Sequence, residues 1–403
     1  MRQADSVAAG VQDFYERYPY PRPVDDLDDY RARWRDRGRR RADFHLFWPA
    51  SLYREDYNIL VAGCGTSQAA KHALRWPNAK VTGIDFSATS VRCTEDLKRK
   101  HDLANLEVRQ LPIERVGELE KAFDQIVCTG VLHHLQDPDA GLRALRNVLE
   151  PDGAMQLMVY APYGRAGVYM LQEFCRLIGV RASDDGIRSL IAALEELPER
   201  HPLARLLRNA PDFRREGALA DALLHPQDRA YSVRQLFELL EGAALRFGRW
   251  VKQAPYSPRC GLMARLPQAA QIAALAPPDQ AAAAELFRGT MTTHSVVAYR
   301  NDGPAQRIVF SGDAWRDYVP IRLPDTLCIQ ERLPPGAAAV LINRAHTNHD
   351  LYLSIDAQEK RLFDFIDGER TIGAIVGDQH GDLGRALFEK LWWHDQIVLD
   401  ASH

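Results

Sequence analysis

The 403-residue sequence lacks paired cysteines, long apolar runs and an excess of basic charge. Its six cysteines are far apart and none forms a CxxC pair, which argues against a disulfide framework and a cysteine zinc site. No uncharged run reaches the ~18 residues that a membrane-spanning helix needs, and the first residues contain no apolar stretch typical of a signal peptide. We therefore expect a cytoplasmic protein without a membrane partner. The cysteines are Cys64, Cys93, Cys128, Cys175, Cys260 and Cys328.

The formal net charge of −3 argues against nucleic acid, and DNA in particular, as a partner, because the chain offers no overall basic field to a phosphate backbone. One segment departs from this balance: residues 31–41 (RARWRDRGRRR) contain seven arginines and one aspartate. The acidic residues 25–29 (DDLDD) directly precede it. We interpret the two as a solvated, self-neutralising helix, with a patch for nucleic acid or an acidic partner as the alternative.

Apolar, strand-like runs alternate with helical segments between residues 56 and 162. This alternation predicts a parallel sheet with helices on both faces, that is, a doubly wound, Rossmann-like α/β unit. The expected strands are residues 57–63, 80–85, 106–111, 123–130 and 154–160.

Residues 163–230 are helical in pattern and interrupt the alternation after the fifth strand, so we interpret them as an inserted cap for the acceptor. Ser232 and Gln235 form a capping box that restarts a helix. Residues 231–302 then complete a seven-stranded sheet. The sixth and seventh expected strands are residues 245–253 and 292–300.

The two ends of the chain have a different character. Residues 1–55 read as an N-terminal strap or lid followed by a helix. Residues 303–403 contain short β segments, three helices and a closing strand, which suggests a small α+β, winged-helix-like accessory domain. Its negative charge favours contact with protein or peptide over DNA.

A glycine turn follows the first expected strand and opens the first helix. Gly63 and Gly65 let the backbone approach a ligand closely, and Asp85 ends the second strand 20 residues after Gly65. At that distance an acidic side chain can accept both hydroxyls of an adenosine ribose, so the pattern predicts an adenosyl cofactor site. A nicotinamide-dependent oxidoreductase would need a third glycine where Gln68 stands.

The ordered motifs VAGCGTS, VTGIDFSATSV and FDQIVCTGVLHHLQDPDAGLRALRNVLEPDGAMQLMVYAPYG resemble those of class I S-adenosylmethionine-dependent methyltransferases, over residues 57–164. FYERYPYPRP (14–23) is similar to a segment ahead of the core in some bacterial members. The resemblance implies S-adenosylmethionine as cofactor and S-adenosylhomocysteine as product. Residues from 303 onward resemble no element of the methyltransferase core.

The resemblance also implies roles for individual residues. Asp85 would take the ribose hydroxyls and Phe86 would lie against the adenine. Pro112 stands where many members have an aspartate that binds the adenine amino group, so that contact would fall to a backbone carbonyl or to Glu114. The implied cofactor-binding residues are Gly63, Cys64, Gly65, Asp85, Phe86, Leu111, Pro112, Thr129 and Gly130.

The candidate catalytic residues follow the fourth and fifth strands. His133 and His134 could remove a proton from an acceptor, because imidazole is the usual base at neutral pH. The same pair also fits a turn that starts a helix, with both rings bonded to nearby backbone groups, and we favour that interpretation. Tyr160 is a further candidate. We predict no metal site, since the histidines are scattered along the sequence.

Other residues are candidates for contact with the acceptor or for a lid. Tyr15, Tyr18 and Tyr20 alternate with prolines, which predicts a non-helical aromatic strap that could cover the cofactor or simply pack on the core. Candidate acceptor contacts are Tyr163, His225 and Tyr231.

These observations predict methyl transfer to a small molecule or to a protein or peptide. The alternative is a non-catalytic regulatory or interaction protein that binds S-adenosylmethionine and works through its C-terminal domain. A homodimer is left open, and the sequence does not identify the acceptor.

Overall fold

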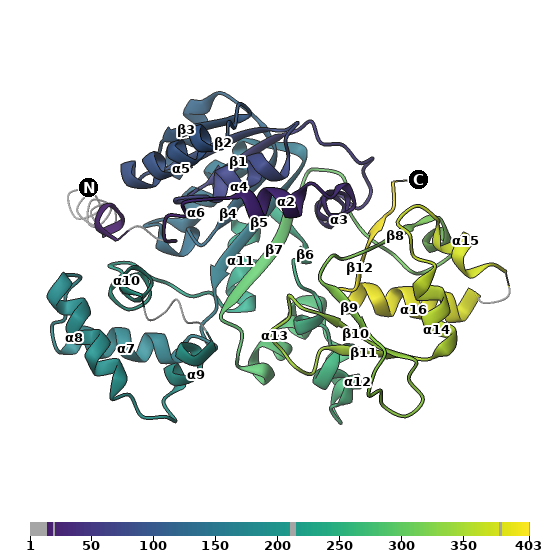
Figure 1. The fold of residues 1–403 in the computed structure, drawn as a ribbon. Helices are drawn as coiled ribbons and strands as arrows, with labels where there is room; N and C mark the ends of the chain where they lie inside the picture. The colour runs from purple at the N-terminus through teal and green to yellow at the C-terminus, as the bar shows by residue number, and fades with distance from the viewer. Residues whose placement is uncertain (1–13, 19–20, 210–214, 379–380, 403) are drawn as a thin grey trace. The chain divides into compact units, whose positions relative to one another are not determined.

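A computed structural model describes residues 14–18, 21–209, 215–378 and 381–402, in two compact units (Figure 1). Unit 1 comprises Met1–Ala32, Asp56–Phe247 and Arg288–Asp302, and unit 2 comprises Arg33–Glu55, Gly248–Phe287 and Gly303–His403. Unit boundaries fall after Glu55 and after Asp302, where the sequence also predicts a division, but the segments are grouped differently. Two segments from the first three hundred residues belong with the C-terminal part.

The sheet of unit 1 confirms the predicted doubly wound α/β fold. Its strand order is β3-β2-β1-β4-β5-β7-β6, with β1 to β5 parallel and β7 antiparallel to β5 (Figure 1). Apolar residues of β1 are fully buried, as expected for a parallel strand covered on both faces. The strands are β1 (Asn58–Ala62), β2 (Lys80–Asp85), β3 (Leu106–Gln110), β4 (Phe123–Thr129), β5 (Leu149–Tyr160), β6 (Leu245–Trp250) and β7 (Thr293–Arg300).

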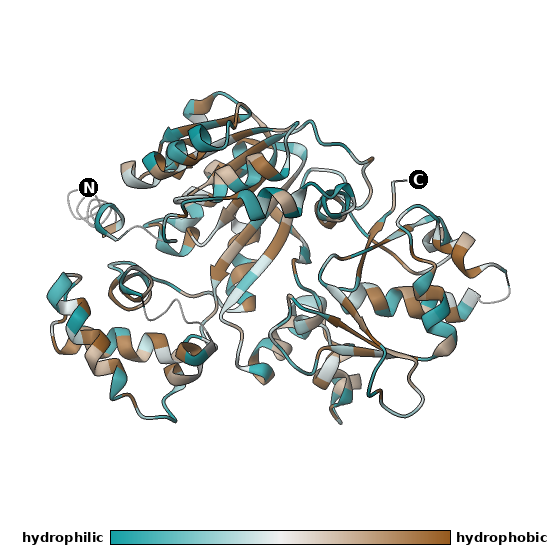
Figure 2. Cartoon of the chain, viewed as in Figure 1, coloured by the Kyte–Doolittle hydropathy of each residue, from teal (hydrophilic) through white to brown (hydrophobic). Residues whose placement is uncertain are grey.

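The helices that connect these strands are amphipathic, with polar and apolar residues on the same helix in Figure 2. The predicted capping box of Ser232 and Gln235 is present at the start of α11. The helices are α4 (Gln68–Arg75), α5 (Ala88–Lys100), α6 (Pro138–Asn147) and α11 (Val233–Gly242).

The insertion after β5 is helical, as predicted, and has an apolar cluster of its own. Val168, Leu190 and Leu219 are among its buried residues. Phe14 and Tyr18 of the N-terminal segment belong to the same cluster, so this segment packs on the insertion. Its helices are α7 (Ala166–Leu177), α8 (Asp184–Glu195), α9 (Pro202–Asn209) and α10 (Glu216–Leu224).

Unit 2 is built around an apolar core that includes Phe363, Phe388 and Leu391. The predicted sequence of three helices and a closing strand is present as α14, α15, α16 and β12; the winged-helix assignment stays a prediction. Strand β12 pairs antiparallel with β8, while β9, β10 and β11 form a separate sheet. The elements are α3 (Arg37–Phe47), β8 (Val319–Arg322), β9 (Thr326–Ile329), β10 (Ala339–Asn343), β11 (Tyr352–Ile355), α14 (Ala357–Asp364), α15 (Ile372–Val376), α16 (Gly381–Trp393) and β12 (Ile397–Asp400).

Three further helices lie at or near the changes from one unit to the other along the chain. They are α2 (Asp28–Trp34), α12 (Ala269–Ala273) and α13 (Pro277–Arg288). Within the described residues, no helix has both the length and the apolar composition that crossing a membrane requires.

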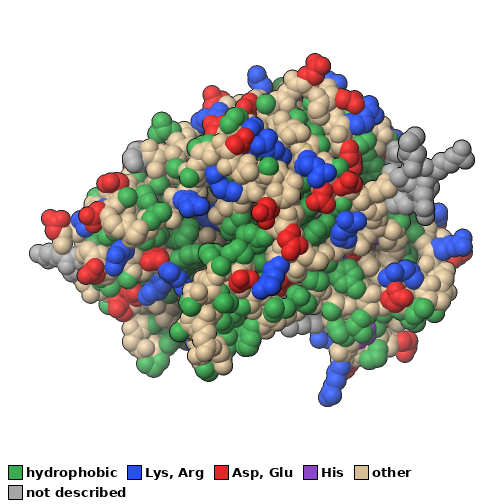
Figure 3. All heavy atoms as spheres, turned by 180° about the vertical axis from the view of Figure 1, so that it is seen from behind, with side chains coloured by type: hydrophobic (Ala, Val, Ile, Leu, Met, Phe, Trp, Pro, Cys, Tyr) green, Lys and Arg blue, Asp and Glu red, His purple; other side chains and the backbone are tan. Residues whose placement is uncertain are grey.

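The arginine-rich segment is not the self-neutralising helix that the sequence predicts. It is divided between α2 and α3, and its arginines find acids elsewhere: Arg40 pairs with Glu55 at 2.9 Å. In the preceding acidic segment, Asp26 pairs with Lys100 at 3.1 Å. Lys and Arg side chains lie among Asp and Glu side chains over the face in Figure 3.

Candidate functional site

The turn after β1 has a backbone that only glycine adopts easily. Gly63 has φ +67° and Gly65 has φ +54°. A Cβ atom on Gly63 would come within 2.4 Å of a methyl group of Val131. The turn therefore leaves a bare stretch of backbone at the carboxyl edge of the sheet, where open α/β folds bind ligands.

Asp85 lies beside this turn at the end of β2. Its carboxylate accepts hydrogen bonds from the backbone N–H groups of Gly65 (2.8 Å) and Ser87 (2.9 Å). Burial raises the pKa of Asp85 to about 6, although these hydrogen bonds oppose the rise. Each oxygen keeps a lone pair, so the carboxylate can accept further hydrogen bonds from hydroxyl groups of a ligand.

A cavity of about 1120 Å³ opens beside the turn and Asp85. Its volume is at the upper end of the range for small-molecule sites, which is enough for a nucleoside and a second ligand. Glu114 also lines the cavity, as expected if it takes over from Pro112. Every predicted cofactor-binding residue lies in the wall: Gly63, Cys64, Gly65, Asp85, Phe86, Leu111, Pro112, Thr129 and Gly130.

The N-terminal strap borders this cavity but is not entirely non-helical. Residues 14–17 are helical, contrary to the prediction, and the N–H of Tyr18 donates to the carbonyl of Phe14 at 2.8 Å. Pro19 disfavours helical conformation in the residue directly before it and in the residues that follow it. The turn at residues 14–17 lies upstream of this restriction and can be helical. Tyr20 lies outside the described residues.

Tyr15 and Tyr18, both in the strap, lie in different environments. Tyr15 lines the cavity, where its ring contacts Phe86 edge to face with centroids 5.9 Å apart. Tyr18 is buried against the helical insertion and donates a hydrogen bond to Asp184 at 3.2 Å. The structure thus brings Tyr15 to the candidate site and takes Tyr18 away from it.

Polar side chains meet at the other end of the cavity. Asp221 is buried in α10 and accepts hydrogen bonds from the hydroxyls of Tyr15 (2.9 Å) and Tyr160 (3.3 Å). Burial raises the pKa values of Tyr15 and Asp221, so Tyr15 remains a neutral donor. The guanidinium of Arg165 stacks on the ring of Tyr160, 3.5 Å from its centroid. These contacts fix both tyrosines at the cavity wall.

His134 is a member of this group, and its tautomer is set by the backbone. Its Nδ1 lies 2.8 Å from the carbonyl oxygen of Gln227, which can only accept, so Nδ1 carries the proton. The lone pair is then on Nε2. His134 lines the cavity, and its ring lies 4.0 Å from that of His225.

His133 has a different environment from its neighbour. It is fully buried, its ring centroid lies 3.8 Å from that of Tyr160, and within the part of the chain that the structure describes neither ring nitrogen has a hydrogen-bond partner. Burial lowers the pKa of His133 well below its usual value. The prediction that both rings bond to backbone groups therefore holds for His134 and fails for His133.

The histidines are scattered in the sequence but not in space. His133, His134 and His225 lie near one another and near Asp221 and Asp228. The remaining predicted contacts lie apart: Tyr163 is exposed outside the cavity wall, and Tyr231 is buried beneath it, its N–H donating to the carbonyl of Tyr160 at 2.9 Å.

Sequence reasoning missed Arg165, Asp221 and Gln227. Asp221 left a signal, because it is the one charge within the otherwise apolar turns ALADALL of α10. A charge on an apolar helix face is rare unless it has a buried partner. Arg165 and Gln227 left none, since their roles depend on contacts with distant segments.

Comparisons with known proteins point in one direction. A methyltransferase domain family matches residues 60–155. An uncharacterised protein of Synechococcus sp. is 35% identical over 251 residues, and the alignment covers 60% of each chain. The ubiquinone biosynthesis O-methyltransferase of Neisseria meningitidis serogroup C is 31% identical over 96 residues, 24% of this chain and 40% of that enzyme. The chain thus spans less than two thirds of the length of these relatives.

Among solved structures, PKMT2 from Rickettsia typhi in complex with AdoHcy has a similar fold. The TM-score is 0.62 at 15% sequence identity, covering 91% of this chain and 75% of that one. The glycine turn with Asp85 beside it also fits an adenosyl group, since Gly63 and Gly65 present backbone without side chains to the cavity and Asp85 can accept further hydrogen bonds there. The chain therefore carries a class I S-adenosylmethionine-dependent methyltransferase domain, as its motifs imply.

Proposed function

We propose that the protein is an enzyme that methylates an acceptor held at the His134 end of the cavity. One observation carries this proposal: a single cavity is lined both by the glycine turn with Asp85 and by His134, Tyr160 and Asp221. A site for a cofactor and a site for a second reactant are therefore continuous. Continuity of this kind lets an enzyme hold two reactants in line, which is worth roughly 7 kcal/mol or more of the barrier.

Specific residues would hold the cofactor. Asp85 would accept the ribose hydroxyls, Phe86 would face the adenine, and Glu114 or a neighbouring carbonyl would accept from the adenine amino group. The backbone at Gly63 and Gly65 would run beside the methionine portion of the cofactor. S-adenosylmethionine, when bound, supplies a methyl group already attached to a positively charged leaving sulfur.

The remaining residues would prepare the acceptor. Tyr15 and Tyr160 stay fixed through Asp221 and restrict the access of water to the cavity. His134 offers the lone pair of Nε2 to an acceptor proton or to an acceptor bound nearby. The relative from Neisseria meningitidis is named an O-methyltransferase, which supports a hydroxyl acceptor over the other classes.

We also propose that the C-terminal part, residues 303–403, selects the acceptor as a winged-helix-like accessory domain, with a small molecule or a protein or peptide as the acceptor. The fold likeness to PKMT2 extends over 91% of the chain and thus includes most of unit 2, which supports a shared role for this unit. The same unit would be the working part in a non-catalytic binding protein, the competing function.

The test uses the full chain and S-adenosylmethionine with a labelled methyl group, incubated with a fractionated cell extract. Enzyme activity predicts time-dependent transfer of label into a protein or small-molecule fraction. Asp85→Ala should abolish the transfer, whereas Asp96→Ala, an exposed acid on α5, should not. Binding of S-adenosylhomocysteine without transfer in any fraction would favour the non-catalytic alternative, and absence of binding would overturn both.

A further inference from the structure

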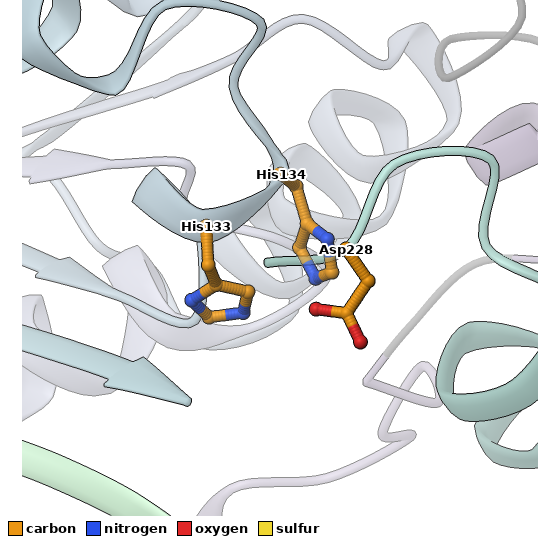
Figure 4. A group of neighbouring side chains, drawn as sticks. All are labelled: His133, His134 and Asp228. Atoms are coloured by element: carbon orange, nitrogen blue, oxygen red, sulfur yellow. The ribbon is translucent and has the colours of Figure 1, made fainter. Parts of the chain in front are cut away.

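We propose that His133, His134 and Asp228 form a binding site for a divalent transition-metal ion beside the acceptor end of the cavity, whose wall includes His134 but not His133 or Asp228. One nitrogen of each histidine and one oxygen of Asp228 lie within 4.8 Å of one another. Figure 4 shows the three side chains pointing toward a common space. Metal binding itself is independent of methyl transfer; only its role in holding an acceptor rests on the proposed function.

The first argument is the unused bonding capacity of these buried groups. Both nitrogens of His133 and the Oδ1 atom of Asp228 have no hydrogen-bond partner among the described residues, and the Asp228 side chain is 2% exposed. A buried polar atom without a partner is destabilising, because it has lost its hydrogen bonds to water. A shared metal ion would satisfy both residues at once.

The second argument is that outer partners already orient two of the three donors. The Nδ1–H of His134 donates to the carbonyl of Gln227, which leaves Nε2 for a metal. Asp228 uses Oδ2 to accept from Gln172 at 2.9 Å and to face Arg165 at 3.6 Å, which leaves Oδ1. Metal-binding histidines and carboxylates usually have such partners for their second polar atom.

The third argument is charge. Two buried carboxylates, those of Asp221 and Asp228, belong to this group, and the guanidinium of Arg165 lies 3.6 Å from Asp228. When both carboxylates are ionised, the group carries a surplus of negative charge in a buried place. A bound cation compensates it, and neutral imidazole is the form that binds metal.

A neighbouring set of donors, His134, Asp221 and His225, is less suited to a metal although its atoms are equally close. The Nδ1 of His225 accepts from the N–H of Gln227 at 3.0 Å, so its Nε2 carries the proton in the neutral ring. Asp221 already accepts from two tyrosines. This contrast makes His225 a matched control.

The ligand chemistry narrows the ion. Two imidazoles and one carboxylate suit Zn²⁺, Fe²⁺ or Co²⁺ better than Mg²⁺ or Ca²⁺, which prefer oxygen. Two donors of a tetrahedral ion are about 3.4 Å apart, so binding requires these side chains to close by up to about 1.4 Å. Three protein ligands leave a coordination position open, where an acceptor hydroxyl would bind and its pKa would fall.

The experiment titrates the metal-free full chain with Co²⁺ and follows its visible absorption, then repeats the titration by competition with Zn²⁺. We expect about one ion per chain, and a loss of affinity of roughly 100-fold or more in His133→Gln and in Asp228→Asn. His225→Gln should retain the affinity of the wild type. Calorimetry with S-adenosylhomocysteine on each variant shows that it is folded.

Three results would overturn the site: no ion bound by the wild type, unchanged affinity in Asp228→Asn, or an equal loss in His225→Gln. Metal binding without binding of S-adenosylhomocysteine would support the site and refute the proposed function. Binding of S-adenosylhomocysteine without binding of any metal would support the proposed function and refute the metal site.

Discussion

The affinity of the protein for S-adenosylhomocysteine should depend on pH through Asp85. The folded-state pKa of about 6 lies well above the ~3.9 of an unfolded aspartate, because burial disfavours the charge. A ribose hydroxyl bonds most strongly to the ionised carboxylate. The protein must therefore lose the Asp85 proton to bind well, and it does so only as the pH rises through about 6.

The size of the effect follows from that pKa. If only the ionised form binds, the apparent Kd at pH 5 is about 11 times its limiting value, and at pH 7 about 1.1 times, so affinity rises roughly tenfold over this range. Binding should release about 0.9 proton at pH 5 and about 0.1 at pH 7.

The same shift affects stability in the opposite sense. Between about pH 4 and pH 6 the folded chain without ligand holds a proton that the unfolded chain has lost, so its stability falls as the pH rises through this window. The two-unit shift of this buried group corresponds to roughly 3 kcal/mol, an order-of-magnitude figure.

Calorimetry at pH 5, 6 and 7, in pairs of buffers with different ionisation heats, measures both affinity and proton release. Asp85→Asn is the control, and its weaker affinity should not vary over this range. A wild-type Kd that is constant from pH 5 to pH 7, or proton uptake on binding, would refute the assignment of Asp85 to the ribose.

Two further predictions concern the backbone around the site. Gly63→Ala should abolish binding of S-adenosylhomocysteine and lower the free energy of unfolding by more than the ~1–2 kcal/mol cost of a left-handed alanine, because its Cβ meets Val131. Gly179→Ala, at φ +72° in open space, should lose only that amount in chemical denaturation. Equal losses in the two variants would show that the Val131 side chain moves aside without cost. The carboxylate of Glu16 accepts a hydrogen bond from the N–H of Thr89, in the first turn of α5, at 3.1 Å. Because a negative charge is favourable at a helix N-terminus, Glu16→Gln should lower the melting temperature by the equivalent of about 0.5–1 kcal/mol. An unchanged melting temperature would mean that this bond does not anchor the strap.

The cofactor half of the cavity could be predicted from sequence because each of its parts is local. A glycine turn needs no distant partner to be recognised, and Asp85 is placed by the length of one strand, helix and strand. Burial of a parallel strand on both faces gives a continuous apolar run, which is why a strand such as β1 is readily located from the sequence.

The acceptor half could not be predicted because it is assembled from segments far apart in the chain. The bond that fixes the tautomer of His134 comes from Gln227, 93 residues later, and Tyr15 reaches Asp221 across 206 residues. No periodicity or spacing encodes such pairs. The sequence signal for the acceptor half of the cavity is Asp221, an aspartate within an otherwise apolar helix.

The division into units has a similar origin and a practical consequence. Ala42 of α3 is buried against Ile321 and Val398, so the segment 33–55 depends on residues after 303 for its partners. Deletion of residues 303–403 should therefore expose apolar surface on α3 and leave a chain that aggregates on heating, even if unit 1 still binds S-adenosylhomocysteine. Light scattering during a thermal scan, with calorimetry at 20 °C, would show both effects. A shortened chain that stays monomeric with an unchanged melting temperature would mean that the packing of α3 within unit 2 contributes little to stability.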